Sequence, residues 1–98
     1  MAAEKRPRKR TGEQISGRAA DYQAIGAWLR ERRVDAHKGQ LELNREMGKS
    51  NTFMYRVEAG RQRIDLLQFL ELARLLQLDR KTTITDLMQA LGWDEKTP

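Results

Sequence analysis

The chain has 98 residues, no cysteine and a formal net charge of +5. A length of this order fits one domain, and the absence of cysteine excludes disulfides and thiolate metal sites. No apolar run approaches the roughly 18 residues needed to cross a bilayer, and the charged N-terminus lacks the apolar segment of a secretory signal. We therefore expect a cytoplasmic protein that does not interact with membranes.

Positive charge is concentrated at the N-terminal end. Residues 1–20 contain six basic and two acidic side chains, whereas the rest of the chain contains 13 basic and 12 acidic ones. Charge, glycine and proline dominate residues 1–18, so this segment cannot bury enough apolar surface to order itself. We place a disordered basic arm at residues 1–20 and a folded domain at residues 21–98. The basic cluster of the arm consists of Lys5, Arg6, Arg8, Lys9 and Arg10.

A short basic arm attached to a nearly neutral body indicates an acidic polymer as partner, most often a nucleic acid. Two other interpretations stay open. The arm could serve only as a solubilising tail, or it could be a nuclear localisation signal, for which short basic clusters are weak indicators.

The first predicted helix covers residues 21–33. Asp21 is a suitable N-cap, and small or apolar residues recur at helical spacing from Tyr22 to Leu29. The same stripe reaches Arg33, and a charge on the inner face of a helix is costly unless it is paired. Arg33 therefore needs an acidic partner.

Two short helices are predicted over residues 40–47 and 51–59, with a glycine-containing turn between them. Gly48 stands where a helix-ending glycine is usual, and Ser50 is a suitable N-cap for the second of the two helices. Gly60 ends that second helix. Two short helices joined by a tight turn form a helix-turn-helix unit.

The helix predicted over residues 51–59 has two chemically different sides. Phe53, Met54 and Val57 cluster on one side, which we expect to pack in the core. The opposite side carries groups that hydrogen-bond to base edges and phosphates, although a solvated helix face would have a similar composition. The residues of this polar side are Asn51, Thr52, Tyr55 and Arg56.

A fourth helix is predicted to start after Asp65. Asp65 and Gln68 have the spacing of a capping box. The apolar face that follows is wide and includes Leu66 and Leu70, so we expect this helix to be central to the core.

The fifth predicted helix covers residues 84–91. Thr83 and Asp86 have the spacing of a second capping box. The apolar stripe of this helix and Trp93, which follows it, either complete the core or form a dimer interface. Because no segment alternates like a strand and no internal repeat is present, we expect an all-α fold with five helices.

The segment from Ile25 to Leu91 resembles the lambda-repressor/Cro-type helix-turn-helix domain, also called the XRE family. A glutamine, two glycines, a helix-capping serine and a Glu-x-Gly element fall at the family's spacing, over about two thirds of the chain. The matching stretches are Gln40-Leu41-Glu42-Leu43, Met47-Gly48-Lys49-Ser50 and Met54-Tyr55-Arg56-Val57-Glu58-Ala59-Gly60-Arg61.

The resemblance implies a five-helix lambda-repressor-like domain that binds double-stranded DNA sequence-specifically and regulates transcription, most often as a repressor. Such a protein would act at the nucleoid of a bacterial cell, and a phage origin is equally compatible. The helix over residues 51–59 would be the recognition helix, whose N-terminal part meets the bases in the major groove.

Individual residue roles also follow from the resemblance. The expected base contacts are Asn51, Thr52, Tyr55 and Arg56. The expected contacts to the DNA backbone are Gln40, Lys49, Ser50, Arg61 and Arg63. The basic cluster of the arm would wrap around the DNA, as the arm of lambda repressor does. Arg33 and Glu58 correspond to an inner salt bridge of the family, which agrees with the independent need of Arg33 for an acid.

Two residues depart from the family pattern. Asn44 stands in the second helix where relatives usually have alanine, which implies a slightly wider helix crossing or a local hydrogen bond. Lys38 stands where relatives usually have an apolar residue, which implies a less well packed loop.

The sequence gives no sign of catalysis or of a cofactor. His37 is the one histidine and has no second ligand at a suitable spacing, so we expect no metal site. No nucleophile elbow, phosphate loop or paired-carboxylate pattern is present. We therefore expect that the protein is not an enzyme.

The expected partner is double-stranded DNA, with a palindromic operator and a homodimer at least on DNA. Two-fold pairing would place the two recognition helices about 34 Å apart. Two alternatives remain. The chain could be an antitoxin that binds a toxin and autoregulates its operon, or a protein-interaction module that has lost DNA binding.

Overall fold

The computed structural model of the chain describes residues 11–93, with side chains from residue 18 onward. Within residues 11–93 the protein contains five helices and no strand, which confirms the predicted all-α fold. None of these helices is both long and apolar enough to cross a membrane. The helices are α1 (Thr11–Asp35), α2 (Gln40–Glu46), α3 (Phe53–Glu58), α4 (Leu66–Leu75) and α5 (Thr83–Ala90).

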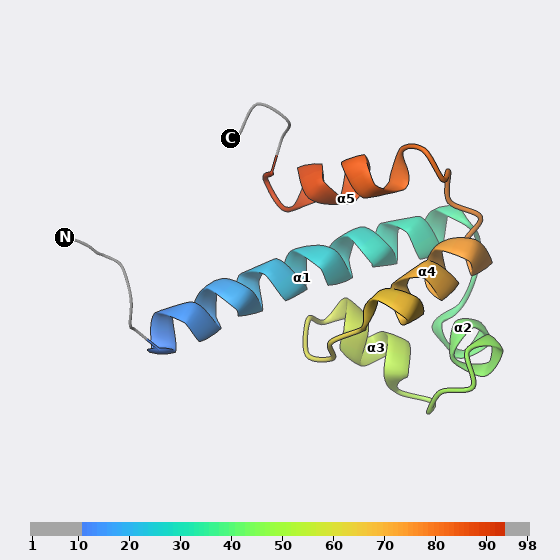
Figure 1. The fold of residues 1–98 in the computed structure, drawn as a ribbon. Coiled ribbons are helices and arrows are strands. Elements are labelled where there is room, and N and C mark those ends of the chain that lie inside the picture. Colours follow the sequence, from blue (N-terminus) through green and yellow to red (C-terminus); the bar gives the residue numbers. More distant parts are fainter. Residues whose placement is uncertain (1–10, 94–98) are drawn as a thin grey trace.

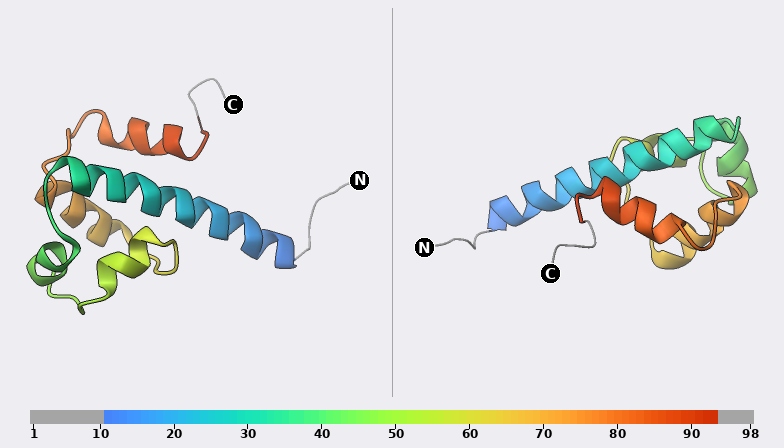
Figure 2. Two further views of the ribbon diagram at one scale, coloured as in Figure 1. Left: turned by 180° about the vertical axis from the view of Figure 1, so that it is seen from behind. Right: turned by 90° about the horizontal axis from the view of Figure 1, so that it is seen from above.

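The long helix α1 forms the axis around which the other helices are arranged (Figure 1). α5 runs along one side of α1, and α2, α3 and α4 lie on the other side, as the reverse view in Figure 2 also shows. The α2–α3 pair and α5 are therefore separated by α1.

α1 begins at Thr11, whereas the sequence predicted a start at Asp21. The second half of the expected disordered arm is thus helical. Once a helix has nucleated, each residue added at its end gains a backbone hydrogen bond without a new nucleation step, and Ala19 and Ala20 favour this extension by their high helix propensity. The basic cluster of the predicted arm, within residues 1–10, lies outside the described residues.

The core lies where α1 faces the other helices. Leu29, Leu43, Met54 and Leu72 are fully shielded from solvent, and they come from α1, α2, α3 and α4 respectively. Burying each of these side chains contributes about 1.5–3 kcal/mol. The other apolar side chains of this core are Trp28, Met47, Phe53, Val57, Phe69 and Leu76.

Two glycines bring α1 and the C-terminal end of α3 into backbone contact. A Cβ atom on Gly26 would lie 2.5 Å from the carbonyl oxygen of Val57 and 2.6 Å from that of Glu58. Gly60 has a φ of +78°, and a Cβ atom there would lie 2.8 Å from the Cα of Gln23. Because only glycine permits such an approach, these two positions fix how α3 sits on α1.

The capping prediction is confirmed for α4 and is wrong for α5. The backbone N–H of Gln68 donates to the Asp65 carboxylate at 2.7 Å, and the N–H of Asp65 donates to the Gln68 side chain at 3.0 Å. α5 instead starts after Thr82, whose side chain makes no capping bond. Thr83, expected to cap, lies inside α5, and its hydroxyl donates to the Asp79 carbonyl oxygen.

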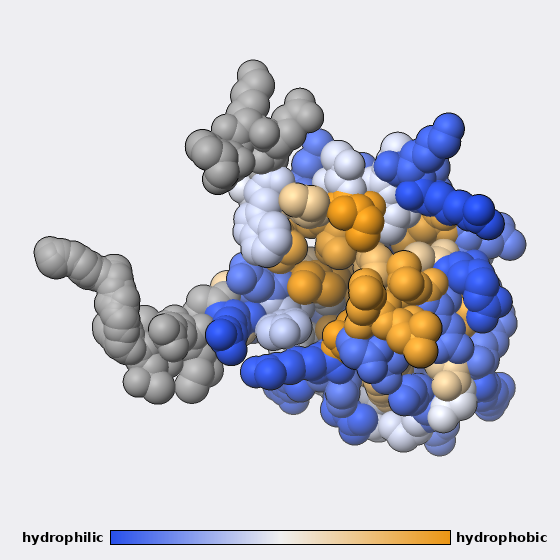
Figure 3. Space-filling view, viewed as in Figure 1, coloured by the Kyte–Doolittle hydropathy of each residue, from blue (hydrophilic) through white to orange (hydrophobic). Residues whose placement is uncertain are grey.

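α4 and α5 bury less apolar surface than predicted. Leu66 and Leu70 were expected in the core but are 70% and 51% exposed, because only one side of α4 faces the core. On α5, Ile84 and Met88 are 50% and 40% exposed, and Trp93 after α5 is 52% exposed. Figure 3 shows the apolar side chains that gather on this face of the molecule. Trp93 therefore does not complete the core.

Candidate nucleic-acid interface

The turn between α2 and α3 matches the sequence prediction at its glycine and differs at its serine. Gly48 follows α2 with a φ of +66°, the left-handed conformation of a helix-ending glycine. α3 begins after Thr52 rather than after Ser50, and the Thr52 side chain makes no capping bond. Ser50 contributes its carbonyl oxygen, which accepts from the N–H of Phe53 at 3.2 Å. The prediction of Ser50 as the N-cap is wrong.

Asn44 of α2 supplies the missing cap from the neighbouring helix. Its side chain is completely buried, and its Oδ1 accepts from the backbone N–H of Met54, in the first turn of α3, at 2.9 Å. Its Nδ2 donates to the carbonyl oxygen of Asn51 at 2.9 Å. Of the two implications drawn from Asn44, a wider helix crossing or a local hydrogen bond, the hydrogen bond is confirmed. These bonds link α2 to the turn and to α3.

A second buried polar cluster joins α1, α2 and α3. The predicted pair of Arg33 and Glu58 is present, with Nε to Oε2 at 2.6 Å and Nη2 to Oε1 at 3.1 Å. Gln40 donates to the same carboxylate at 2.9 Å, and Arg33 also donates to the carbonyl oxygen of Lys38 at 2.9 Å. The Glu58 side chain is only 5% exposed, so it needs these donors. The hydrogen bonds that Arg33 donates to the Glu58 carboxylate raise the pKa of Arg33, although burial opposes this.

The loop before α2, which was expected to be less well packed because of Lys38, contains a polar contact. The Nζ of Lys38 lies 2.9 Å from Oε1 of Glu46 at the end of α2, and the Lys38 side chain is 22% exposed. An ion pair therefore holds this loop in place of apolar packing.

α3 presents a polar surface on the side opposite its buried residues. Phe53, Met54 and Val57 are buried, as the sequence predicted. Thr52 at the start of α3 and Tyr55 within it are exposed. Of the predicted base-contacting residues, Asn51, Thr52 and Tyr55 are exposed and Arg56 is half-buried.

Arg56 is held by Thr52. Its Nη1 donates to the Thr52 hydroxyl at 2.8 Å, so the guanidinium is directed back toward the start of α3. Its Nε is buried and has no hydrogen-bond partner among the described residues. The pair combines a planar donor group with a hydroxyl on one exposed edge of the helix.

The residues expected to contact the DNA backbone do not all share this surface. Lys49 and Ser50 in the turn and Arg61 after α3 are exposed. Arg63 lies over the Tyr22 ring of α1, with 5.4 Å from its guanidinium carbon to the ring centroid. The side-chain amide of Gln40 is engaged with Glu58, as described above. The structure thus groups the turn residues with α3, whereas Gln40 is bonded to Glu58 and the exposed Arg63 lies against α1.

Residues with metal-binding chemistry do not cluster within the described part of the chain. In the part of the chain that the structure describes, no three His, Asp or Glu side chains come close enough to hold a metal ion. His37 is exposed in the loop after α1 and has a φ of +58°, which suits a tight turn.

Comparison of the chain with protein-family models, with curated proteins and with solved structures gives no match. A functional assignment therefore depends on the residues and geometry described above.

Proposed function

We propose that this protein binds double-stranded DNA sequence-specifically and regulates transcription, acting as a repressor. In this proposal α2, the turn and α3 form a helix-turn-helix of the lambda-repressor type, and α3 enters the major groove. The observation on which the proposal depends is that α3 has two chemically different sides. Its apolar side is buried, Tyr55 and Arg56 lie on the other side, and the exposed Asn51 and Thr52 directly precede its first turn.

The way in which α3 is held supports this proposal. Base recognition requires hydrogen-bonding side chains on a rigid support, because small displacements lose the contact. α3 is fixed by the close approach of Gly26, by the cap from Asn44 and by the hydrogen bonds of Glu58. A six-residue helix with three independent attachments is better suited to reading a fixed surface than to adapting to a variable one.

In this proposal, different residues provide specificity and affinity. Amide, hydroxyl and guanidinium groups of α3 and of the turn before it would hydrogen-bond to base edges, and Arg is the commonest specific partner of guanine. Lys49, Ser50 and Arg61, at the two ends of α3, would contact phosphates and contribute most of the salt-dependent affinity. A homodimer on DNA would place two α3 helices about one turn of the double helix apart, on a palindromic operator.

The test is a binding selection of the purified full chain against a randomised duplex library. We expect a palindrome with half-sites about one helical turn apart. Asn51→Ala should change the preferred base at one position of each half-site and leave the salt dependence unchanged. Arg61→Ala should preserve the motif and lower the slope of log affinity against log salt by about one.

Two outcomes would contradict the proposal. A library from which no motif is enriched would exclude sequence-specific recognition. Identical effects of Asn51→Ala and Arg61→Ala on motif and salt slope would contradict the division between base and phosphate contacts. Leu41→Gln is a suitable control, because Leu41 is half-exposed on α2 and outside the proposed interface.

An antitoxin that also regulates its own operon is the second candidate function. One observation favours it over simple repression: the apolar face of α4 and α5, which a protein partner could cover. Co-purification of a small toxin with the tagged chain from its native host would establish this function.

A further inference from the structure

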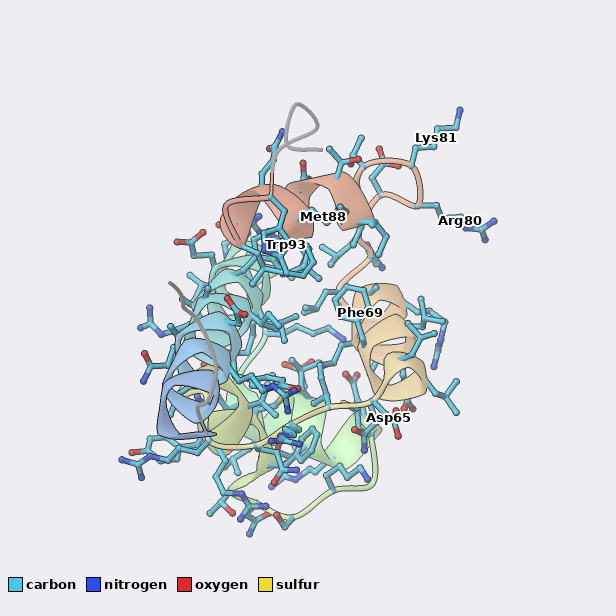
Figure 4. The ribbon with its side chains drawn as sticks, turned by 60° about the vertical axis from the view of Figure 1, so that its left-hand side comes forward. Asp65, Phe69, Arg80, Lys81, Met88 and Trp93 are labelled. Atoms are coloured by element: carbon cyan, nitrogen blue, oxygen red, sulfur yellow. The ribbon has the colours of Figure 1, made fainter. Side chains whose placement is uncertain are left out.

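An apolar groove separates α4 from α5. Phe69 of α4 points into the space between the two helices, and Met88 and Trp93 lie on the α5 side (Figure 4). One part of the groove has a volume of about 420 Å³ and is lined by Leu70 and Ala73 of α4 and by Ile84 of α5, among others. A second part of about 210 Å³ shares Phe69 and Ile84 with the first. The two parts therefore adjoin at Phe69 and Ile84 and follow the space between α4 and α5.

The walls of this groove leave large apolar side chains in solvent. Leu66 and Leu70 from α4 and Ile84 from α5 are all between 50% and 70% exposed. Single exposed apolar residues are ordinary, but a contiguous apolar patch on two facing helices is typical of an interaction surface.

The charges at the ends of the groove define an orientation. Arg74 and Arg80 line the end where α4 turns into α5, and Lys81 is exposed next to them. Neither arginine forms a salt bridge within the described part of the chain. Asp65 lies at the other end. A ligand that fits has an apolar middle and an acidic end.

We propose that this groove binds an amphipathic helix of a partner protein, with its acidic end next to Arg74 and Arg80. Helices dock in such grooves through apolar residues spaced by three or four positions, and opposite charges at the rim set the direction. Val57 on the buried side of α3 lines the second part of the groove, but Asn51, Thr52 and Tyr55 line neither part, so an occupied groove would leave the polar side of α3 accessible. The proposal does not depend on DNA binding.

A second copy of this chain fits the groove less well. The segment that a second copy would offer is α5, whose eight residues include a single acidic side chain, Asp86, in the first turn. Each copy would also bring the basic residues Arg74, Arg80 and Lys81 to the interface, which opposes self-association and favours an acidic partner.

The experiment is a selection with the purified full chain from a phage-displayed library of randomised peptides about 16 residues long, enough for four turns of helix. We expect enriched peptides to combine apolar residues at helical spacing with a net negative charge. Their affinities are then measured by fluorescence anisotropy on synthetic copies. Leu70→Gln and Ile84→Gln should each weaken binding at least tenfold, whereas Leu41→Gln, an equally exposed leucine on α2, should have no effect.

The double variant Arg74→Gln/Arg80→Gln tests the predicted orientation. It should lower the affinity for an acidic peptide about fivefold, as expected for surface ion pairs. The affinity for the matched peptide, with glutamine in place of each glutamate, should stay unchanged. Circular dichroism of each variant reports whether the fold is intact.

Three results would overturn the proposal. These are a selection that enriches no binder sensitive to Leu70→Gln or Ile84→Gln, enrichment of neutral or basic peptides, and a dimer in sedimentation equilibrium that Ile84→Gln dissociates. The last result would assign the groove to a second copy. Sequence-specific DNA binding is measured separately with variants of α3, so its failure is distinguishable from each of these results.

Discussion

The α2–α3 pair and the groove between α4 and α5 differ in what they bury and what they expose. Around α2 and α3, polar groups are buried and paired: Glu58 accepts from two side chains, and Asn44 bonds to two backbone groups. Along the α4–α5 groove, apolar groups are exposed, including Leu70 and Ile84. Buried polar networks make one geometry much more stable than its neighbours, whereas exposed apolar surface gains free energy only when something covers it. The first region is suited to presenting a fixed surface, and the second to receiving a partner.

The largest expected effect comes from breaking the hydrogen-bond cluster of Arg33 and Glu58 that joins α1, α2 and α3. Arg33→Met should lower the free energy of unfolding by about 3–5 kcal/mol, because it leaves the Glu58 carboxylate buried without its main partner. Urea denaturation followed by circular dichroism measures this. Arg30→Met, which removes an exposed arginine from the same helix, is the matched control and should have little effect.

The charge state of this pair is also predictable. Because the pKa of Arg33 is raised in the folded protein, its stabilising charge is fully present below the unfolded pKa and is lost only as pH rises through the higher folded value. Mildly alkaline buffer should therefore leave the Arg33→Met difference in stability unchanged.

A smaller effect is expected at the helix crossing. Gly26→Ala adds a methyl group 2.5 Å from the Val57 carbonyl oxygen, so the backbones of α1 and α3 must separate. Overpacking of this kind costs about 1–3 kcal/mol. Gly39→Ala is the control, since a Cβ there has no neighbour within 4 Å. Equal stability of the two variants in urea would show that the close crossing is not a constraint.

Removing the cap that Asn44 of α2 provides to α3 should lower the free energy of unfolding by about 1–3 kcal/mol. Asn44→Ala leaves the Met54 N–H and the Asn51 carbonyl without their partner. Thermal unfolding measures the loss, and Arg45→Ala, at the next and exposed position, serves as the control. A variant as stable as the wild type would mean that water replaces the side chain without cost.

The smallest effect completes the comparison. Leu70→Gln, in the α4–α5 groove, should change the free energy of unfolding by less than about 0.5 kcal/mol, because half of the side chain is already in water. A loss comparable with that of Asn44→Ala would show that Leu70 belongs to the core, and the contrast between the α2–α3 pair and the groove would fail.

Local sequence patterns predicted what local interactions determine. The helix-ending glycines, the capping box of Asp65 and the polar side of α3 were all predicted from neighbours within a few residues along the chain. The Arg33–Glu58 pair, 25 residues apart, was also predicted, because a charge in an apolar stripe requires an acid and the family resemblance indicated which one.

The incorrect predictions concern contacts between helices, which the local sequence does not determine. A stripe of leucines shows that α4 has an apolar side, but not how much of that side is covered, so Leu66 and Leu70 were wrongly placed in the core. The cap of α3 was assigned to Ser50 on local spacing, whereas it is provided by Asn44 of α2, which lies ten residues before the Met54 N–H that it accepts from. The start of α1 was placed too late because composition outweighed helix extension.

The cap from Asn44 has a consequence for the dynamics of α3. Six residues are too few to remain helical alone, and the N–H of Met54 is bonded to a side chain that belongs to the buried face of α2. α3 cannot fray at its first turn without exposing Asn44, and exposing Asn44 disrupts the core. The amide proton of Met54 should therefore exchange with solvent only through global unfolding, as slowly as amides at the centre of α1.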